Sequence, residues 1–112
     1  MTDMPNYSKH DVILVRYPFT DSSDSKIRPA VIVSAPHTSQ DIFIVPLTSR
    51  TRDLQNGEFV LSNWAEAGLS IETAVKRGVF TVADSLVRKR VGKLSAEDTN
   101  RLDQSLKEWF GI

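Results

Sequence analysis

The sequence alternates short apolar runs with polar, turn-forming loops, and no run is long enough for more than one strand. Residues 11–19, 30–35 and 41–47 are rich in β-branched and aromatic side chains, which is typical of strands. Proline or a cluster of Ser, Thr and Asp follows each run and favours a turn there. This pattern predicts a mainly β fold, a small curled antiparallel sheet or barrel.

The later part of the chain is less regular. We expect four elements there: a short strand over 58–61, one helical turn over 62–69, a single strand over 72–82 and a weaker strand over 86–91. Ser62 is expected to cap the helical turn and Gly68 to end it. Gly78 is expected to form a bulge within the long strand.

The C-terminal segment has the clearest helix pattern. Ser95 is followed three residues later by Asp98, a capping box with the shorter acid, and Glu97 adds negative charge to the first turn. Gly111 is expected to end the helix. The apolar residues fall at helical spacing and are expected to anchor the helix on the sheet: Leu102, Leu106, Trp109 and Phe110.

Composition limits the class of protein. A chain of 112 residues has room for one core, so we expect a single domain over residues 1–112. Lys and Arg number 14, as do Asp and Glu, so nucleic-acid binding would depend on local clusters of charge. The chain has no cysteine and 2 histidines, which gives disulfides no basis and a metal site or cofactor little support. With neither a secretory signal pattern nor a membrane-spanning apolar run, a soluble cytoplasmic protein is expected.

Arg28 is the first candidate for chemistry. It precedes Pro29, which biases it toward an extended backbone at the start of an apolar strand. A guanidinium group carries a permanent charge and five donors, which suits it to gripping a phosphate. The alternative is a salt bridge to Asp21 or Asp24 of the preceding loop, and such roles are the more common ones for a surface arginine.

Thr48 is the second candidate. It follows residues 45–47 at the end of a strand, where its hydroxyl can point into the same concavity as Arg28. The alternative is a turn or helix cap formed with Ser49, which the spacing alone favours. His10 and His37 lie next to turns, and both are expected at the surface.

Further basic and aromatic residues are candidates for binding nucleic acid. The basic set could form a footprint or a solvated rim: Arg50, Arg52, Lys76, Arg77, Arg88, Lys89 and Arg90. Phe19, Trp64 and Phe80 could stack on bases, although core packing is the stronger expectation for aromatics in strands. The residues alone thus predict a small β domain with a candidate anion site at Arg28 and Thr48.

Four blocks of sequence resemble the PemK/MazF family of toxin–antitoxin ribonucleases. The chain carries, in the family's order, Asp11–Val15 with Pro18–Asp21, then Lys26–Ser34, Val45–Ser49 and Val91–Ser95. The second block, with its Arg-Pro pair, is the most recognisable. The resemblance spans about residues 10–110.

The resemblance implies an SH3-like barrel of the CcdB/MazF type with a C-terminal helix, assembled as a homodimer. It implies a metal-independent endoribonuclease that cuts single-stranded mRNA and is inhibited by a cognate antitoxin. Arg28 would take part in proton transfer and stabilise charge on the phosphorane, and Thr48 would hold the phosphate. The high pKa of arginine makes the electrostatic role the stronger expectation. Residues expected to contact substrate are Phe19, Thr20, Asp21, Lys26, Ser49, Arg50 and Arg77.

The chain differs from the family pattern in two places. His10 stands where the opening motif usually has glycine, and residues 76–81 replace a Gln-Ile-Arg segment found in many of these toxins. Two alternatives to the ribonuclease remain at this point. One is a non-catalytic barrel that binds nucleic acid or a protein such as DNA gyrase, as CcdB toxins do. The other is a degenerate relative that only dimerises.

Overall fold

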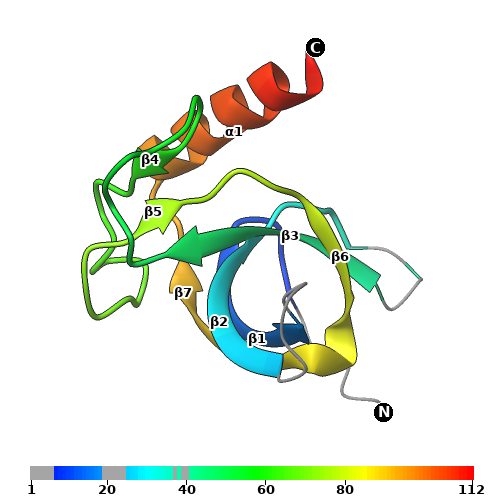
Figure 1. Cartoon of the computed structure of the whole chain (residues 1–112). Helices are drawn as coiled ribbons and strands as arrows, with labels where there is room; N and C mark the ends of the chain where they lie inside the picture. The colour runs from blue at the N-terminus through cyan, green and yellow to red at the C-terminus, as the bar shows by residue number, and fades with distance from the viewer. Residues whose placement is uncertain (1–6, 19–24, 37, 39–40) are drawn as a thin grey trace.

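The computed structural model describes residues 7–18, 25–36, 38 and 41–112, which form a curled antiparallel sheet with one long helix across one end (Figure 1). The elements are β1 (Asp11–Pro18), β2 (Ser25–Ile32), β3 (Asp41–Thr48), β4 (Phe59–Val60), β5 (Ala74–Val75), β6 (Phe80–Ala83), the 3-10 helix η1 (Asp84–Leu86), β7 (Val87–Lys93) and α1 (Ala96–Phe110). The prediction of a mainly β barrel with a C-terminal helix is confirmed. No helix within these residues is both long and apolar enough to cross a membrane.

The strands pair in the order β4-β5-β3-β2-β1-β7, and β6 pairs with β3. From β6 the chain passes through η1 to β7, which pairs with β1 at the far end of this order, so the sheet curls round on itself (Figure 1). As predicted, β3 is the hairpin partner of β2. This pairing places the β2 strand that carries Arg28 next to the β3 strand that ends at Thr48.

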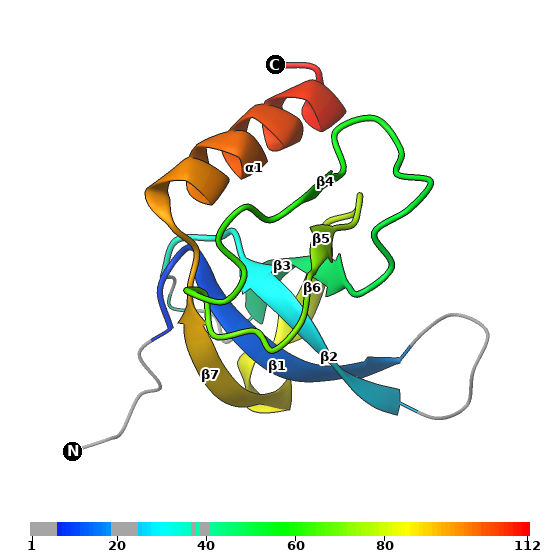
Figure 2. The ribbon, with the colours of Figure 1, turned by 90° about the vertical axis from the view of Figure 1, so that its left-hand side faces the viewer.

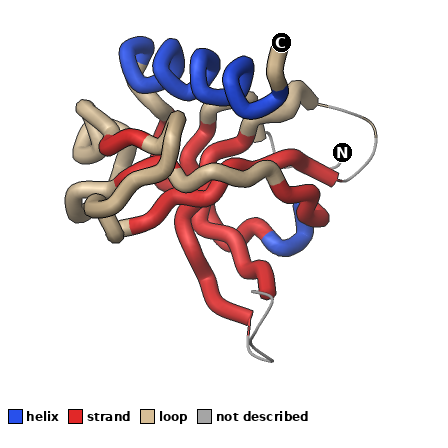
Figure 3. The backbone as a smooth tube through the Cα atoms, turned by 45° about the horizontal axis from the view of Figure 1, so that its top comes forward, coloured by secondary structure: helices blue, strands red, loops and turns tan. Residues whose placement is uncertain are grey.

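The central strands are buried on both faces, which explains their uninterrupted apolar runs. α1 lies across one side of the sheet, next to the segment that contains β4 (Figures 2 and 3). One apolar cluster includes Leu102 of α1 together with Val12, Val31, Val45, Leu47, Phe59, Leu61, Ala67, Val75 and Leu94. The other lies on the opposite faces of β1, β2 and β3, because neighbouring strand residues point to opposite sides, and contains Ile13, Val15, Ala30, Ile32, Ile44 and Val82.

β2 begins earlier than predicted. It starts at Ser25, so Pro29 is an interior residue of the strand and not its first. Over residues 25–29 β2 pairs with β1 alone, and its pairing with β3 begins at Ala30. A strand bordered on one side tolerates a residue without an N–H group, which explains how proline fits here.

The single strand predicted over residues 72–82 is wrong, because the structure divides it into β5 and β6. Both lie along the same edge of β3, where Val75 pairs with Leu47 and Phe80 with Ile44. The β5–β6 side has two more residues between these pairs than β3 has, and the extra length includes Gly78 at a φ of 146°. Instead of the predicted bulge at this glycine, the pairing with β3 is interrupted between Val75 and Phe80.

The predicted helical turn over residues 62–69 is a hydrogen-bonded turn, and its predicted cap is wrong. The Asp98 carboxylate of α1, and not the Ser62 side chain, accepts the backbone N–H groups of Ser62 and Asn63, each at 2.9 Å. Gly68 ends the turn as predicted, with a φ of 91°. Because Asp98 is fully buried, this contact ties the turn firmly to the helix.

The limits of α1 agree with the sequence. The Ser95 hydroxyl accepts the N–H of Asp98 at 3.2 Å, and Gly111 closes the helix at a φ of 72°. Leu102 is buried and Trp109 packs against the core, but Phe110 is 60% exposed. The prediction that Phe110 anchors the helix is therefore wrong.

Candidate functional site

The two residues predicted to act in catalysis line the same pocket. This pocket has a volume of about 380 Å³ and includes Arg28 and Pro29 of β2, Thr48 at the end of β3, and Ser49. It lies where β2 has no pairing with β3, so side chains of the two strands can converge without a ladder between them. The strands, rather than a mobile loop, set the distance between the two groups.

Arg28 is exposed and pairs with Val15 of β1. Its backbone is therefore fixed by the sheet, and the residue forms part of the pocket lining. Asp21 and Asp24, its alternative partners, lie outside the described residues.

The Thr48 side chain stabilises a turn, as its spacing favoured, but its partner is Arg50 and not Ser49. Its Oγ1 accepts the backbone N–H of Arg50 at 3.0 Å, not that of Ser49. A hydroxyl that accepts one bond keeps its own proton for donation. The turn therefore fixes the Oγ1 atom and leaves its O–H group able to donate to an anion in the pocket.

The opposite wall depends on two glycines that face each other. A Cβ atom on Gly68 would lie 2.1 Å from the Val91 carbonyl oxygen, and one on Gly92 would lie 2.2 Å from that of Ala67. Gly68 and Val91 themselves line the pocket. The sequence analysis missed this wall, although Gly92 in the last matching block was the signal for a close backbone approach.

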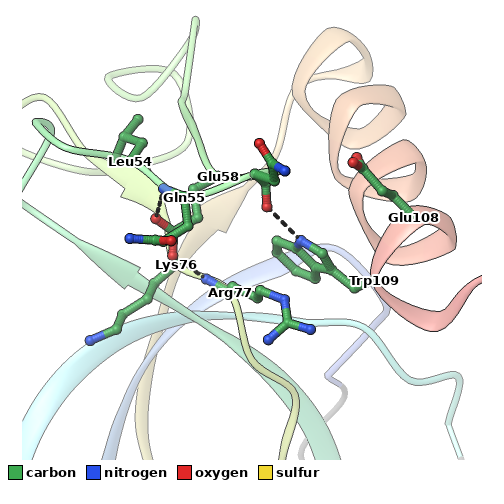
Figure 4. A pocket seen from close by; sticks show the side chains of 8 residues that line it. Leu54, Gln55, Glu58, Lys76, Arg77, Glu108 and Trp109 are labelled. Carbon is green, nitrogen blue, oxygen red and sulfur yellow. Dashed lines mark hydrogen bonds between the residues drawn. The ribbon is translucent and has the colours of Figure 1, made fainter.

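Two further pockets continue from Thr48. The first, of about 260 Å³, is lined by Thr48, Arg50, Arg52, Asp53, Leu54, Gln55, Glu58 and Lys76. The second, of about 780 Å³, is lined by Leu54, Gln55, Asn56, Glu58, Lys76, Arg77, Glu108 and Trp109 (Figure 4). The first two pockets share Thr48, and the last two share Leu54, Gln55, Glu58 and Lys76, so the three adjoin in a row from Arg28 to Trp109; together we call them the groove.

Glu58 organises the middle of the groove. One carboxylate oxygen accepts the N–H of Gln55 at 2.7 Å and the other accepts that of Arg77 at 2.8 Å. The backbone N–H of Lys76 donates to the Pro46 carbonyl at 2.9 Å. These bonds hold the loop before β4 and the segment after β5 against β3, so the basic residues of the groove start from a fixed backbone.

The groove gathers some of the residues predicted to bind substrate and not others. Ser49 lies in the first pocket, Arg50 in the second and Arg77 in the third. Lys26 is exposed two residues before Arg28 on β2 and lines none of these pockets. Phe19, Thr20 and Asp21 lie outside the described residues.

The two aromatic candidates within the described residues differ. Trp64 packs against the core, as expected. Phe80 is 47% exposed, so the prediction that it packs in the core is wrong. It lines none of the three pockets. Trp109 packs against the core, as its predicted anchoring role requires, and it also lines the third pocket of the groove.

His10 lies outside the groove. Its φ of 78° is in the left-handed region, which explains why glycine suits this position. Its Nε2 atom is buried, 3.7 Å from the Asp103 carboxylate, and burial lowers the pKa of the imidazole. Across the described residues, no three His, Asp or Glu side chains are grouped so as to hold a metal ion.

Comparisons with known proteins agree with this arrangement. A family model described as PemK-like, MazF-like toxin of type II toxin–antitoxin system matches residues 8–110. A comparison with curated proteins gave no match.

Several solved structures share the fold. An endoribonuclease from a mycobacterial species matches with a TM-score of 0.75 at 16% identity, over 97% of this chain and 95% of that one. The Mycobacterium tuberculosis toxin MazF-mt6 matches with a TM-score of 0.73 at 20% identity, over 91% and 97%. A mycobacterial endoribonuclease in complex with its cognate antitoxin matches with a TM-score of 0.72 at 18% identity, over 96% and 97%. At these identities the likeness establishes the fold.

Proposed function

Since the chain belongs to the family of PemK-like, MazF-like toxins of type II toxin–antitoxin systems, we propose that it is an endoribonuclease that cuts single-stranded mRNA without a metal ion. The observation that carries this proposal is the pocket shared by Arg28 and Thr48. A permanent cation and a hydroxyl donor in one pocket are suited to a phosphodiester, whose oxygens gain charge during cleavage. The mycobacterial endoribonucleases of the same fold support it.

In the proposed reaction the 2′-oxygen of the substrate forms a bond to the adjacent phosphorus, and the bond from phosphorus to the 5′-oxygen breaks. The products are a 2′,3′-cyclic phosphate and a 5′-hydroxyl end. The proton lost by the 2′-hydroxyl is balanced by the proton gained by the 5′-oxygen. Arg28 stabilises the charge on the phosphorane. Thr48 donates its O–H to a phosphate oxygen, because its Oγ1 accepts the Arg50 N–H and so keeps its own proton for donation.

The wider assignments belong to the same proposal. We propose one domain over residues 1–112 that acts in the cytoplasm as a homodimer and is inhibited by a cognate antitoxin. Support for the antitoxin comes from the similar endoribonuclease whose structure includes one. Ser49, Arg50 and Arg77 would contact RNA from the groove, and the other proposed contacts are Phe19, Thr20, Asp21 and Lys26.

The test is cleavage of a purified mRNA, with the cut site mapped by its ends. Arg28→Ala is expected to lower the rate by about 10²–10³-fold and Thr48→Val by about tenfold, because each removes a donor to the phosphate. Arg88→Ala is the matched control, since Arg88 is an exposed arginine of β7 that lines none of the three pockets. Excess EDTA is expected to leave cleavage unchanged.

Two outcomes would contradict the proposal. Arg28→Ala and Thr48→Val enzymes as fast as the unaltered protein would exclude the pocket as the active site, and loss of cleavage in EDTA would exclude the metal-free reaction. Intact RNA together with inhibition of purified DNA gyrase would instead identify a non-catalytic, CcdB-like barrel.

A further inference from the structure

The groove extends well beyond the pair proposed to act on the phosphate. Its third pocket, of about 780 Å³, is larger than the 380 Å³ pocket around Arg28 and Thr48. Lys76 belongs to the second and third pockets, and Thr48 to the first and second. A linear polymer held at Thr48 would therefore meet the second and third pockets in turn on its way to Trp109.

Trp109 has a fixed orientation at this end. Its indole Nε1 donates to the Asn56 carbonyl at 2.9 Å, and a Cβ atom on Gly57 would lie 2.3 Å from Nε1. The Ser105 hydroxyl holds the same loop by donating to the Gly57 carbonyl at 2.6 Å. The ring is thus clamped between α1 and the loop, and it forms part of the pocket wall. A fixed aromatic ring beside basic side chains, here Lys76 and Arg77, is the kind of surface on which single-stranded bases stack.

Arg77 supplies a charge beside the ring. Its side chain extends toward Trp109, whereas that of Lys76 runs away from Trp109 (Figure 4) and also lines the second pocket. The Arg77 backbone is held by Glu58, so the guanidinium starts from a fixed point. The pair therefore offers a stacking face and a phosphate donor at one place, and Lys76 offers a second cation between this place and Thr48.

We infer that this end of the groove binds one nucleotide of single-stranded RNA away from the cleaved bond, its base against Trp109 and its phosphate at Arg77. The inference rests on the proposed function and adds a subsite that sets how long an RNA the protein recognises. Glu108 also lines this pocket, and its carboxylate is negatively charged, as a phosphate is. A negatively charged ligand is therefore repelled by Glu108, whereas a basic peptide would be attracted.

The first test is binding by fluorescence. The chain has 2 tryptophans, Trp64 and Trp109, so Trp64→Phe leaves Trp109 as the single reporter. The probe is an RNA oligonucleotide that contains the mapped cut site with three further nucleotides on each side and a 2′-deoxy sugar at the cut. We expect it to quench Trp109, Arg77→Gln to weaken binding about tenfold, and Glu108→Gln to strengthen it about two- to threefold.

The second test compares this long RNA, with its 2′-hydroxyl restored, against a minimal RNA of the mapped site alone. Arg77→Gln and Trp109→Ala are expected to lower kcat/KM for the long RNA about tenfold more than for the minimal RNA. Arg88→Gln is the control and should not change the ratio, because Arg88 lines none of the three pockets. If Trp109→Ala does not fold, Arg77→Gln and the quenching give the answer.

Three results would overturn the inference while the proposed function stands: equal losses on long and minimal RNA, an unquenched Trp109 at saturating RNA, or weaker RNA binding in Glu108→Gln. Quenching of Trp109 by an antitoxin peptide with none by RNA would assign this end of the groove to protein. Failure of the proposed function looks different, because then neither RNA is cut by the unaltered protein.

Discussion

The two ends of the groove are positioned by different kinds of contact. At one end, Arg28 and Thr48 stand on strands whose mutual pairing begins just beyond the pocket, at Ala30 and Pro46, while Arg28 itself pairs with β1 and Thr48 with β5. At the other, Trp109 is held by hydrogen bonds from side chains of α1 to carbonyl groups of a loop. Groups that act on one bond need a fixed separation, which a sheet supplies to the pair proposed for catalysis. The loop and the end of α1 lie outside that part of the sheet, so under the proposed function they are where substrate preference would differ between relatives.

Asp98→Ala should have the largest effect, and it tests whether the end with Arg28 and Thr48 depends on anything besides the sheet. It leaves the N–H groups of Ser62 and Asn63 without their buried acceptor and frees the turn that leads to Gly68 in the pocket wall. Each lost bond to a buried group costs about 1–3 kcal/mol, so we expect unfolding free energy in urea to fall by about 3 kcal/mol.

Glu97→Ala is the matched control for this change, because Glu97 is an exposed acid in the same helical turn. It should lower stability by no more than about 0.5 kcal/mol. An Asp98→Ala protein as stable as this control would show that the turn does not depend on α1.

Gly92→Ala changes the wall of the first pocket directly. The new methyl group would lie 2.2 Å from the Ala67 carbonyl oxygen, so the two backbones must move apart. We expect a loss of about 1–3 kcal/mol in unfolding free energy and a lower rate of RNA cleavage.

Gly111→Ala is the comparison for Gly92→Ala. Its Cβ atom would meet nothing within 4 Å, and its φ of 72° costs about 1 kcal/mol without touching the groove. Equal cleavage by the two variants would mean that the glycine contact does not shape the active pocket.

Ser105→Ala should loosen the loop that holds Trp109 without affecting the pocket of Arg28 and Thr48. It removes the bond to the Gly57 carbonyl and should lower unfolding free energy by about 1 kcal/mol. In a Trp64→Phe background, we expect the Trp109 emission to shift as its clamp loosens. The exposed Ser85 of η1 provides the control as Ser85→Ala. An unshifted emission would show that the indole bond to Asn56 is sufficient by itself.

The smallest effect concerns pH. Burial lowers the pKa of His10 from 6.5; Asp103 opposes this shift, and Lys9 and Lys93 add to it. The folded state therefore favours neutral His10, and the stability this gives is full above pH 6.5 and is lost as pH falls through 6.5 toward the folded-state pKa. In a His37→Gln background, unfolding free energy should fall between about pH 7.5 and about pH 5.5, and adding His10→Gln should flatten this slope. The same slope in both proteins would exclude His10 as its source.

The sequence predicted the first strands of the sheet and the C-terminal helix well. The strands β1 and β3 and the limits of α1 follow from apolar patterning and caps, and these signals are local. Arg28 and Thr48 were identified from their motifs, and the hairpin pairing of their strands places them in one pocket. The family resemblance supplied a reaction that neither residue indicates by itself.

The rest depends on contacts that local patterns do not contain. The Asp98 cap joins residues 35 and 36 positions apart, and the Trp109 bond to Asn56 spans 53 positions. The break after β5 follows from the two extra residues opposite β3, whereas the sequence shows only a glycine in an apolar run. For the same reason, the sequence predicted that Trp109 anchors α1 but did not show that it also lines the groove.

The long-range cap by Asp98 also has a consequence for when the pocket of Arg28 and Thr48 is completed. A ribosome delivers the chain from its N-terminus, so β2 and β3, which carry these two residues, emerge well before the helix that holds Asp98. The pocket wall at Gly68 follows a turn whose backbone donors find their acceptor only on that helix. The growing chain therefore carries Arg28 and Thr48 before the wall of their pocket is held in place, and that wall is secured only once α1 has been made.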